Sequence, residues 1–156
     1  MTPLHDLLAV LRETNALTLA TLDPDGTPRA TPLFFAVDLD QVSDGHLVLP
    51  FSVLFLSDPA SAHSLDLARD PRASVALYPG ETDWRSLRGA QMKGHAERLQ
   101  GGASERALTT YRQRIPIAAE LEDAVAHSAV YRFSPAWARL IDNRRGFGHR
   151  EEWTWP

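Results

Sequence analysis

Within the strand-like segment that begins at Arg88, residues from Ala90 to Glu97 alternate strictly between two kinds of side chain. The even-numbered positions from 90 to 96 are small or apolar, whereas the odd-numbered positions from 91 to 97 are polar or charged. Because successive side chains of a strand point to opposite faces, this alternation predicts a strand with one apolar and one polar face. Gly94 within it indicates a bulge, or a close approach by another strand or a flat ligand. An ordinary half-exposed strand, with Gln91 and Lys93 facing solvent, is the alternative.

The length of the chain and its lack of cysteine limit the possible architectures. At 156 residues we expect one domain over residues 1–156, able to bury roughly 70% of its unfolded surface without cross-links. The chain has no cysteine, which excludes thiol nucleophiles, thiolate metal sites and disulfide frameworks. Its composition is compatible with a reducing cytoplasm.

Other features bear on location and on partner class. The first eleven residues include His5 and Asp6 and have no basic region before their apolar residues, unlike a secretory signal. The longest apolar run, 47–56, is too short for a membrane-spanning helix and is interrupted by Pro50. We therefore expect a cytoplasmic protein with no membrane association. The net charge of −4 gives no broad basic field, so we also expect no nucleic-acid partner.

The first forty residues predict a helix followed by a β-hairpin. Thr2 and Pro3 suit a helix start, and leucines at 4, 7, 8 and 11 recur on one helical face. Two β-type segments, 17–22 and 27–37, are joined by a turn that contains proline and glycine. Pro28 and Pro32 cannot donate to a ladder, which places part of the second strand at an edge, a bulge or a ligand site.

The remainder of the chain predicts further short strands and a few helices. We expect strand structure in the run 47–56 and a helix that starts at Ser57, Asp58 and Pro59, with Ala62, Leu65 and Ala68 or Arg69 turned inward. The other expected elements are a strand at 73–78, a helix after Gly101-Gly102 with Ala107, Leu108 and Tyr111 in the core, a helical piece near 117–126, and closing strands at 129–133 and 137–141. Such antiparallel strands close readily into a small barrel.

Local chemistry favours an anion site near the second predicted helix. Ser57, Ser61, His63 and Ser64 lie at or just inside the start of that helix. Free backbone N–H groups and the helix dipole favour a phosphate there, and serine hydroxyls add donors. Simple helix capping by serine or aspartate is the competing interpretation.

Other reaction classes find little support in the sequence. The six histidines form no His-x-His or His-Glu-x-x-His spacing, so we expect no metal site. A Gly-x-Ser-x-Gly elbow and the glycine signatures of phosphate or dinucleotide loops are also missing. The paired carboxylates, Glu151 with Glu152 and Asp38 with Asp40, are interpreted as solvated faces. No residue is assigned as a catalytic base.

The tail from Asp142 to Trp155 combines aromatic residues with glycines. Such a tail can cover a flat ligand or a partner subunit. It can equally form a packed C-terminal strand in which Trp153 and Trp155 share one face and bury apolar area. The sequence leaves both alternatives open.

Several segments, taken in order, resemble one superfamily. They are the hairpin turn Asp25-Gly-Thr-Pro28, the strand end Leu56-Ser-Asp58 before Ser61-x-His63, and the segments 69–75, 94–99, 111–116 and 141–148. In order and spacing they resemble the pyridoxamine 5′-phosphate oxidase-like FMN-binding split barrels over nearly the whole chain.

The resemblance implies a mainly β fold, a six-stranded antiparallel Greek-key split barrel with flanking helices. It also implies a homodimer with FMN in the groove between subunits. By this resemblance the FMN phosphate is held by Ser57, Ser61 and His63, and the flavin ring lies over Thr31, Pro32 and Leu33. Gln91 and Lys93 are then expected to contact the ring, and Phe147 to cover the ring or the substrate mouth.

The chain also departs from the oxidase pattern. If Gly94 is aligned with the family glycine, Gln91 lies two residues later than the oxidase glutamine, on the same face at another height. Arg29 is out of register with the family arginine, Phe35 stands near the position of its lysine, and the tail lacks the substrate-binding arginine and histidine motif. We therefore do not predict pyridoxamine phosphate oxidation.

The sequence thus predicts a flavin-dependent oxidoreductase in which FMN exchanges electrons with an unidentified small molecule. A non-catalytic flavin or haem carrier on the same barrel is the alternative.

Overall fold

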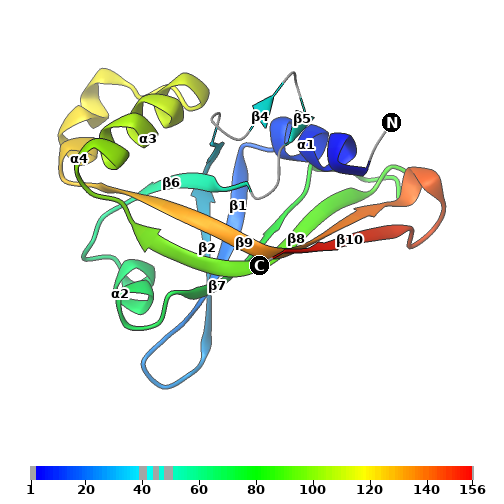
Figure 1. Ribbon diagram of the computed structural model, residues 1–156, viewed down its shortest axis with the longest axis horizontal. Helices are drawn as coiled ribbons and strands as arrows, with labels where there is room; N and C mark the ends of the chain where they lie inside the picture. The colour runs from blue at the N-terminus through cyan, green and yellow to red at the C-terminus, as the bar shows by residue number, and fades with distance from the viewer. Residues whose placement is uncertain (1–2, 39–41, 44–45, 48–50, 156) are drawn as a thin grey trace.

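A curled antiparallel sheet forms the centre of the protein (Figure 1). The computed structural model describes residues 3–38, 42–43, 46–47 and 51–155. In spatial order the strands are β2 (Pro28–Phe34), β1 (Ala16–Leu22), β7 (Arg72–Leu77), β8 (Arg88–Arg98), β9 (Ala129–Asp142), β6 (Val53–Ser57) and β3 (Ala36–Val37), with β10 (Arg150–Thr154) also paired to β9. A separate ribbon pairs β4 (Val42–Ser43) with β5 (His46–Leu47).

The sheet closes because one stretch of chain serves both of its edges. β2 pairs with β1 at one edge, and β3 pairs with β6 at the other. Only Phe35 separates β2 from β3, and its side chain is fully buried. β2 also contacts β6 without sharing a ladder with it. The predicted antiparallel split barrel is therefore confirmed, although the main sheet has eight strands instead of six.

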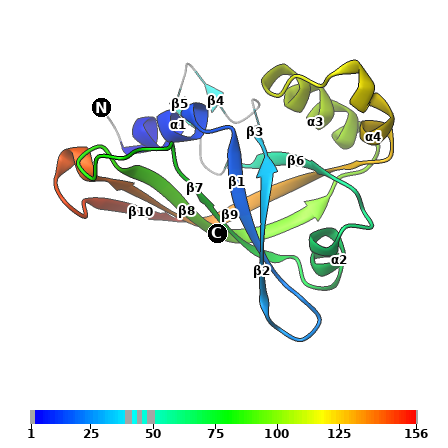
Figure 2. The same ribbon diagram turned by 180° about the vertical axis from the view of Figure 1, so that it is seen from behind.

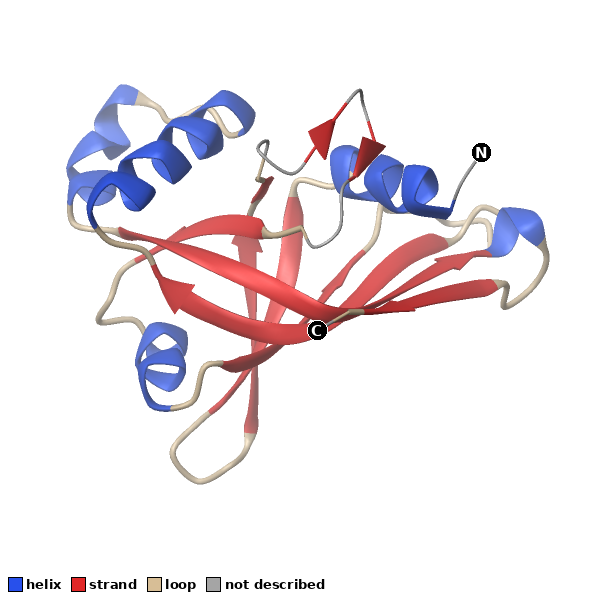
Figure 3. Ribbon diagram, viewed as in Figure 1, coloured by secondary structure: helices blue, strands red, loops and turns tan. Residues whose placement is uncertain are grey.

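Helices cover the rims of this barrel (Figure 3). They are α1 (Pro3–Glu13), α2 (Ala62–Arg69), α3 (Gly101–Arg114) and α4 (Glu122–Ala126), with short 3-10 turns η2 (Ala119–Leu121) and η3 (Asn143–Arg145). Leu7, Leu8 and Leu11 of α1 are buried, as their spacing predicts, and so are Ala107 and Tyr111 of α3. Within the described part of the chain, no helix is long and apolar enough to cross a membrane.

Strand β8 has the predicted two faces, and Gly94 has a structural role in it. Ala90, Met92 and Ala96 are buried, whereas the odd-numbered positions from 91 to 97 are exposed. The register between β8 and β9 shifts between Lys93 and Gly94. A Cβ at Gly94 would lie 2.1 Å from the carbonyl oxygen of Ser134. The close approach predicted at this glycine is therefore made by a neighbouring strand.

The same bulge explains why β9 is one strand where the sequence predicts two. Residues 129–133 pair with β6, and residues 137–141 pair with β10, while both parts remain paired to β8. The predicted break at Ser134-Pro135 falls where the outer neighbour changes. The bulge opposite Gly94 accommodates the proline, which cannot donate to a regular ladder.

Two other predictions concern α2 and the tail. The predicted start and inward face of α2 are wrong: the helix begins at Ala62, and Leu65 is 55% exposed. Its buried side chains are His63, Ser64, Asp66 and Leu67. The tail forms the packed strand β10, with Trp153 and Trp155 against the main core.

The interpretation of Asp38 as a solvated carboxylate is also wrong. Its side chain is buried and lies 3.4 Å from the Arg132 guanidinium and 3.3 Å from the Ser52 hydroxyl. Asp40 lies outside the described residues, as do the predicted strand positions 48–50 and the helix-cap position Thr2.

The close packing at Gly94 predicts that a larger residue at this position destabilises the fold. We expect Gly94→Ala to lower the free energy of unfolding by about 3 kcal/mol, because a rigid backbone oxygen occupies the space that the methyl group requires. Gly80→Ala is the matched control, since a Cβ at Gly80 meets no atom within 4 Å. Urea denaturation followed by tryptophan fluorescence measures both, and equal stability of the two variants would contradict the role of Gly94.

Candidate functional site

The residues expected to bind the cofactor lie in several parts of the structure. Three of them converge at the start of α2, three lie along the edge strand β2, two project from the exposed side of β8, and one lies in the loop before β10. In the same order these are Ser57, Ser61 and His63; Thr31, Pro32 and Leu33; Gln91 and Lys93; and Phe147.

The first group, together with Ser64, forms a hydrogen-bonded set that we call the serine–histidine cluster. The Nε2 atom of His63 lies 2.5 Å from Ser57 Oγ, and Ser61 Oγ lies 3.1 Å from Ser57 Oγ and 2.8 Å from Ser64 Oγ. Ser57, His63 and Ser64 are buried, and Ser61 is half-buried. Burial lowers the pKa of His63, so the imidazole is neutral at pH 7. The cluster therefore offers hydrogen bonds without a formal positive charge.

Simple capping does not account for this arrangement. Ser61 is the N-cap residue of α2, yet its side chain makes no capping hydrogen bond, and no acidic residue lies in the first turn. Its hydroxyl is instead 2.7 Å from the Asp58 carbonyl oxygen. Asp58 closes a turn ahead of the helix by accepting a hydrogen bond from the Ala60 N–H. The first-turn N–H groups of α2 thus have no side-chain cap among the described residues.

The turn that follows holds a buried carboxylate, Asp66, which the sequence analysis missed. Its side chain is 2% exposed and accepts hydrogen bonds from Thr21 Oγ1 at 2.8 Å and Arg29 Nε at 2.7 Å. Burial raises the pKa of Asp66, but these bonds, with another from Arg69, outweigh it and hold the pKa below its usual range. The sequence pattern places Leu65 on the inward face of α2, so it does not predict the burial of Asp66 or this contact. The Arg29 guanidinium is therefore already paired with the Asp66 carboxylate.

Strand β2 lies at an edge of the sheet (Figure 2), which is one of the three positions that its two prolines allow. Thr31 and Leu33 are half-buried, whereas Pro32 is exposed and Phe34 is 59% exposed. The strand therefore presents an accessible edge and flat, small side chains to a ligand or a second chain.

The exposed side of the sheet, which we call the outer face, carries a hollow of about 370 Å³. We call it the outer groove. Gln91 and Lys93 line it together with Thr18, Ser74, Trp137 and Arg139. Lys93 Nζ and the Arg139 guanidinium each lie 5.1 Å from the centre of a Trp137 ring. Cross-strand register brings these residues together, since Lys93 is opposite Trp137 and Gln91 is opposite Arg139. Trp137 and Arg139 gave no separate signal in the sequence.

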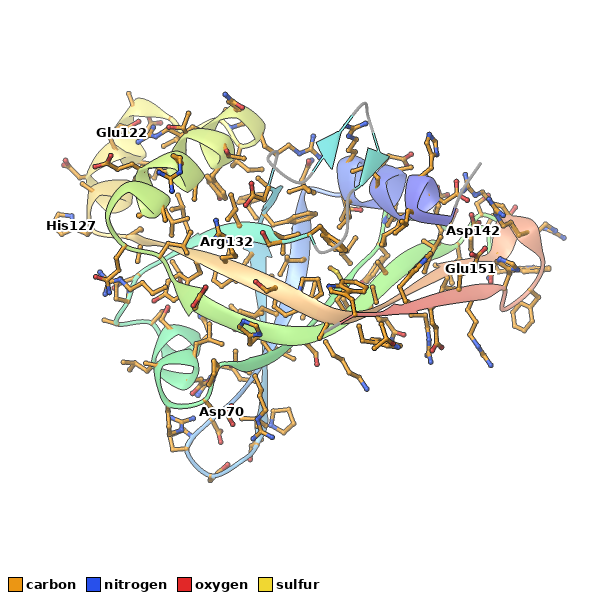
Figure 4. All side chains as sticks on the ribbon, viewed as in Figure 1. Asp70, Glu122, His127, Arg132, Asp142 and Glu151 are labelled. Atoms are coloured by element: carbon orange, nitrogen blue, oxygen red, sulfur yellow. The ribbon has the colours of Figure 1, made fainter. Side chains whose placement is uncertain are left out.

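Phe147 lies at the other end of the sheet from α2. Its ring is 84% exposed and makes an edge contact with Trp84, with ring centres 5.6 Å apart. Figure 4 labels Asp142 and Glu151 at this end, and Asp70 beside the end of α2. Within one subunit, Phe147 is therefore not brought to the serine–histidine cluster. Across the described residues, no group of three or more potential metal ligands is assembled.

The family to which the chain belongs agrees with this architecture. The model of the pyridoxamine 5'-phosphate oxidase family matches residues 4–142. The protein is thus a member of that family, and its split barrel is the family fold.

Individual curated relatives match a smaller part of the chain than the family model does. UPF0306 protein YhbP from Escherichia coli O157:H7 (strain EC4115 / EHEC) is 34% identical over 87 residues, covering 54% of this chain and 56% of the relative. A second YhbP, from Escherichia coli strain SMS-3-5 / SECEC, is 36% identical over 91 residues, with 53% and 54% covered. The chain spans about half the length of these curated relatives.

Solved structures share the fold over most of the chain. The conserved hypothetical protein Rv2991 from Mycobacterium tuberculosis has 26% identity and a TM-score of 0.72, covering 93% of this chain and 87% of that one. A heme binding protein from Mycobacterium smegmatis has 22% identity and a TM-score of 0.76, with 99% and 58% covered. A pyridoxamine 5'-phosphate oxidase-related, FMN binding protein from Nostoc punctiforme has 16% identity and a TM-score of 0.59, with 98% and 91% covered.

The Asp66 contacts predict how stability depends on pH. The native carboxylate has a lowered pKa, so its contribution is present above the unfolded pKa and is lost as the pH falls through the folded one. We expect Asp66→Asn to cost about 2 kcal/mol at pH 7, and to flatten the loss of stability below about pH 4.

Asp83→Asn is the control, because the Asp83–Arg85 pair is exposed at 51% and 70%. Its effect should stay below about 1 kcal/mol. Chemical denaturation between pH 3 and pH 7 tests both variants, and an acid dependence of Asp66→Asn equal to that of the unsubstituted protein would contradict the assignment.

Proposed function

We propose that this protein is an FMN-dependent oxidoreductase that works as a homodimer on a small-molecule substrate. The observation that carries the proposal is the start of α2, where the first-turn N–H groups lack a side-chain cap and the hydroxyls of Ser57, Ser61 and Ser64 lie at the same end of the helix. Such a helix start attracts a phosphate through aligned N–H groups and the helix dipole. A cytoplasmic location remains a prediction.

The electrostatics of the cluster define how it would hold a phosphate. His63 is neutral at pH 7, and Arg29 is paired with Asp66. Binding would therefore depend on backbone N–H groups and on the hydroxyls of Ser57 and Ser61, without a free cation beside them in the described part of the chain. When bound, FMN supplies the electron transfer, while the residues of this chain orient it and control access to it.

The expected cofactor-binding residues lie on both faces of the sheet, which supports a site shared by two subunits. α2 packs on the inner side of the sheet, where Asp66 meets Thr21, whereas Gln91 and Lys93 project from the outer face. A ligand held at the cluster of one subunit, with its ring over β2, would meet Gln91 and Lys93 from a second copy. Phe147 would likewise reach the ring only from a partner. We therefore propose a homodimer with composite sites.

Flavin is favoured over haem by the environment of His63. Relatives of this fold include proteins described as FMN binding and as heme binding. His63 could hold a haem iron only through a ring nitrogen that is free to coordinate it. The buried Nε2 of His63 is engaged with Ser57 at 2.5 Å. A haem carrier is the second candidate, and the pigment of the purified protein distinguishes the two.

The first test is the visible absorption spectrum of freshly purified protein, with mass spectrometry of the compound released on denaturation. We expect a flavin spectrum and released FMN. A Soret band with released haem would favour the carrier, and a colourless protein that fails to bind added FMN would contradict both.

The phosphate site predicts the effect of substitutions at the cluster. Ser61→Ala combined with His63→Ala should weaken FMN binding by roughly 10- to 100-fold, since each change removes a hydrogen-bonding group from a charged ligand. Ser104→Ala with His127→Ala is the control, because both residues lie on the α3–α4 side of the molecule. Fluorescence titration with FMN measures the affinities, with circular dichroism to verify folding. Unchanged affinity in the cluster variant would remove the phosphate assignment.

The composite site predicts that two variants that each bind FMN weakly restore FMN binding when they form a mixed dimer. One variant carries Ser61→Ala with His63→Ala, and the other carries Gln91→Ala with Lys93→Met. A mixed dimer contains one site with both substituted halves and one intact site, so co-refolding should restore up to about a quarter of the FMN-binding sites at wild-type affinity. If the site lies within one subunit, mixing restores none. Titration of the separate and mixed proteins distinguishes these outcomes.

A further inference from the structure

Lys93 is the single lysine among the sixteen basic residues of the chain, and it lies in the outer groove. No ion pair of its ammonium group is found among residues 3–38, 42–43, 46–47 and 51–155. Its recorded contact is with the face of Trp137. An ammonium group held over an aromatic ring retains its full charge and its hydrogen-bond donors for a ligand.

The charges around Lys93 favour a ligand with one negative charge. Arg139, the other cation of the groove, lies 2.7 Å from the Glu152 carboxylate. Lys93, Arg139 and Glu152 together carry one net positive charge, and Thr18, Ser74 and Gln91 add uncharged polar groups to the walls. One net positive charge is neutralised by a single carboxylate, whereas a phosphate dianion would leave one negative charge uncompensated in the groove.

An apolar extension adjoins this charged region. A second hollow of about 200 Å³ shares Ala76 and Gln91 with the outer groove. Tyr78, Leu87 and Ile141 line it, together with Arg88, whose guanidinium is paired with Glu13. From Lys93 to Gly89, which also lines the second hollow, the strand extends about 13 Å at 3.3 Å per residue. The two hollows together suit an elongated molecule with an anionic head and an apolar body.

We propose that the outer groove binds an aryl or alkyl carboxylate, with the carboxylate at Lys93 and the apolar body against Tyr78, Leu87 and Ile141. This assignment rests on the proposed function in one respect, because it identifies the ligand as the substrate that reaches the flavin of the second subunit. Binding of the carboxylate itself requires no flavin, so the two proposals are tested separately.

The single lysine allows a direct measurement of binding. Reductive methylation of the full chain with ¹³C-formaldehyde labels Lys93 and the terminal amine only, and keeps both positively charged. Methylated Lys93→Arg protein identifies the Lys93 signal by its absence. We expect 4-biphenylcarboxylate to shift the Lys93 ¹³C signal saturably. Movement of the terminal signal alone would overturn the proposal.

Matched probes and variants separate the head from the body of the ligand. Calorimetry on unmethylated protein should show about tenfold weaker binding of 4-biphenylcarboxylate to Lys93→Met, and the same loss for the neutral 4-biphenylcarboxamide on unsubstituted protein. Tyr78→Ala should weaken the biphenyl ligand several-fold and leave acetate unaffected. Tyr78 is 65% exposed, so this variant keeps the fold intact. Equal affinity of acid and amide would overturn the proposal.

Repeating the titration with FMN distinguishes the substrate from the cofactor. Because the proposed composite site also brings Lys93 to the flavin ring, we expect saturating FMN to change the affinity for 4-biphenylcarboxylate without abolishing its binding. If FMN abolishes carboxylate binding, the groove belongs to the cofactor and the substrate assignment fails. If FMN does not bind at all, the proposed function fails, and the carboxylate titration still decides the present inference.

Discussion

The ladder between β8 and β9 is the interaction on which the rest of the structure depends. These are the longest strands of the sheet, and their pairing runs from Arg88–Asp142 to Arg98–Tyr131. The ladder stays continuous only because Gly94 lets the Ser134–Pro135 backbone approach closely. The resulting bulge allows β9 to pair with β10 along one half and with β6 along the other. Both the barrel core and the outer groove are built on this shared strand.

A second constraint is the buried carboxylate of Asp66. It ties α2 to β1 through Thr21 and to β2 through Arg29, which fixes the serine–histidine cluster at the end of the barrel. The same bonds neutralise Arg29. The cluster itself consists of serine hydroxyl groups and a neutral imidazole beside the uncapped start of α2. Lys93, whose ammonium group has no ion pair among the described residues, lies on the opposite face of the sheet.

Much of the fold follows from local pattern, and the exceptions have physical causes. The leucine spacing of α1 and the alternation of β8 predicted the buried faces correctly, and the prolines of β2 allowed its edge position. Each of these patterns depends on a single helix or strand and on which of its sides is buried. The face of α2 was predicted wrongly, since Ala62 and Leu65 suit an apolar stripe, whereas burial there is decided by the ion pair of Asp66. The sequence predicts a break at Pro135, whereas the structure has a bulge there. The bulge forms because the partner strand has Gly94 opposite Pro135, which leaves room for the irregular backbone.

The sequence by itself determined the antiparallel barrel class, the closeness of Ser57, Ser61 and His63 along the chain, and the polar face of Gln91 and Lys93. It did so because turn residues and period-two alternation act over a few residues. Only the tertiary structure decided that Trp137 and Arg139 surround Lys93, that Asp66 holds Arg29, and that the two groups of site residues occupy opposite faces of the sheet. Those relations depend on strand register and helix orientation, which contacts distant in sequence determine.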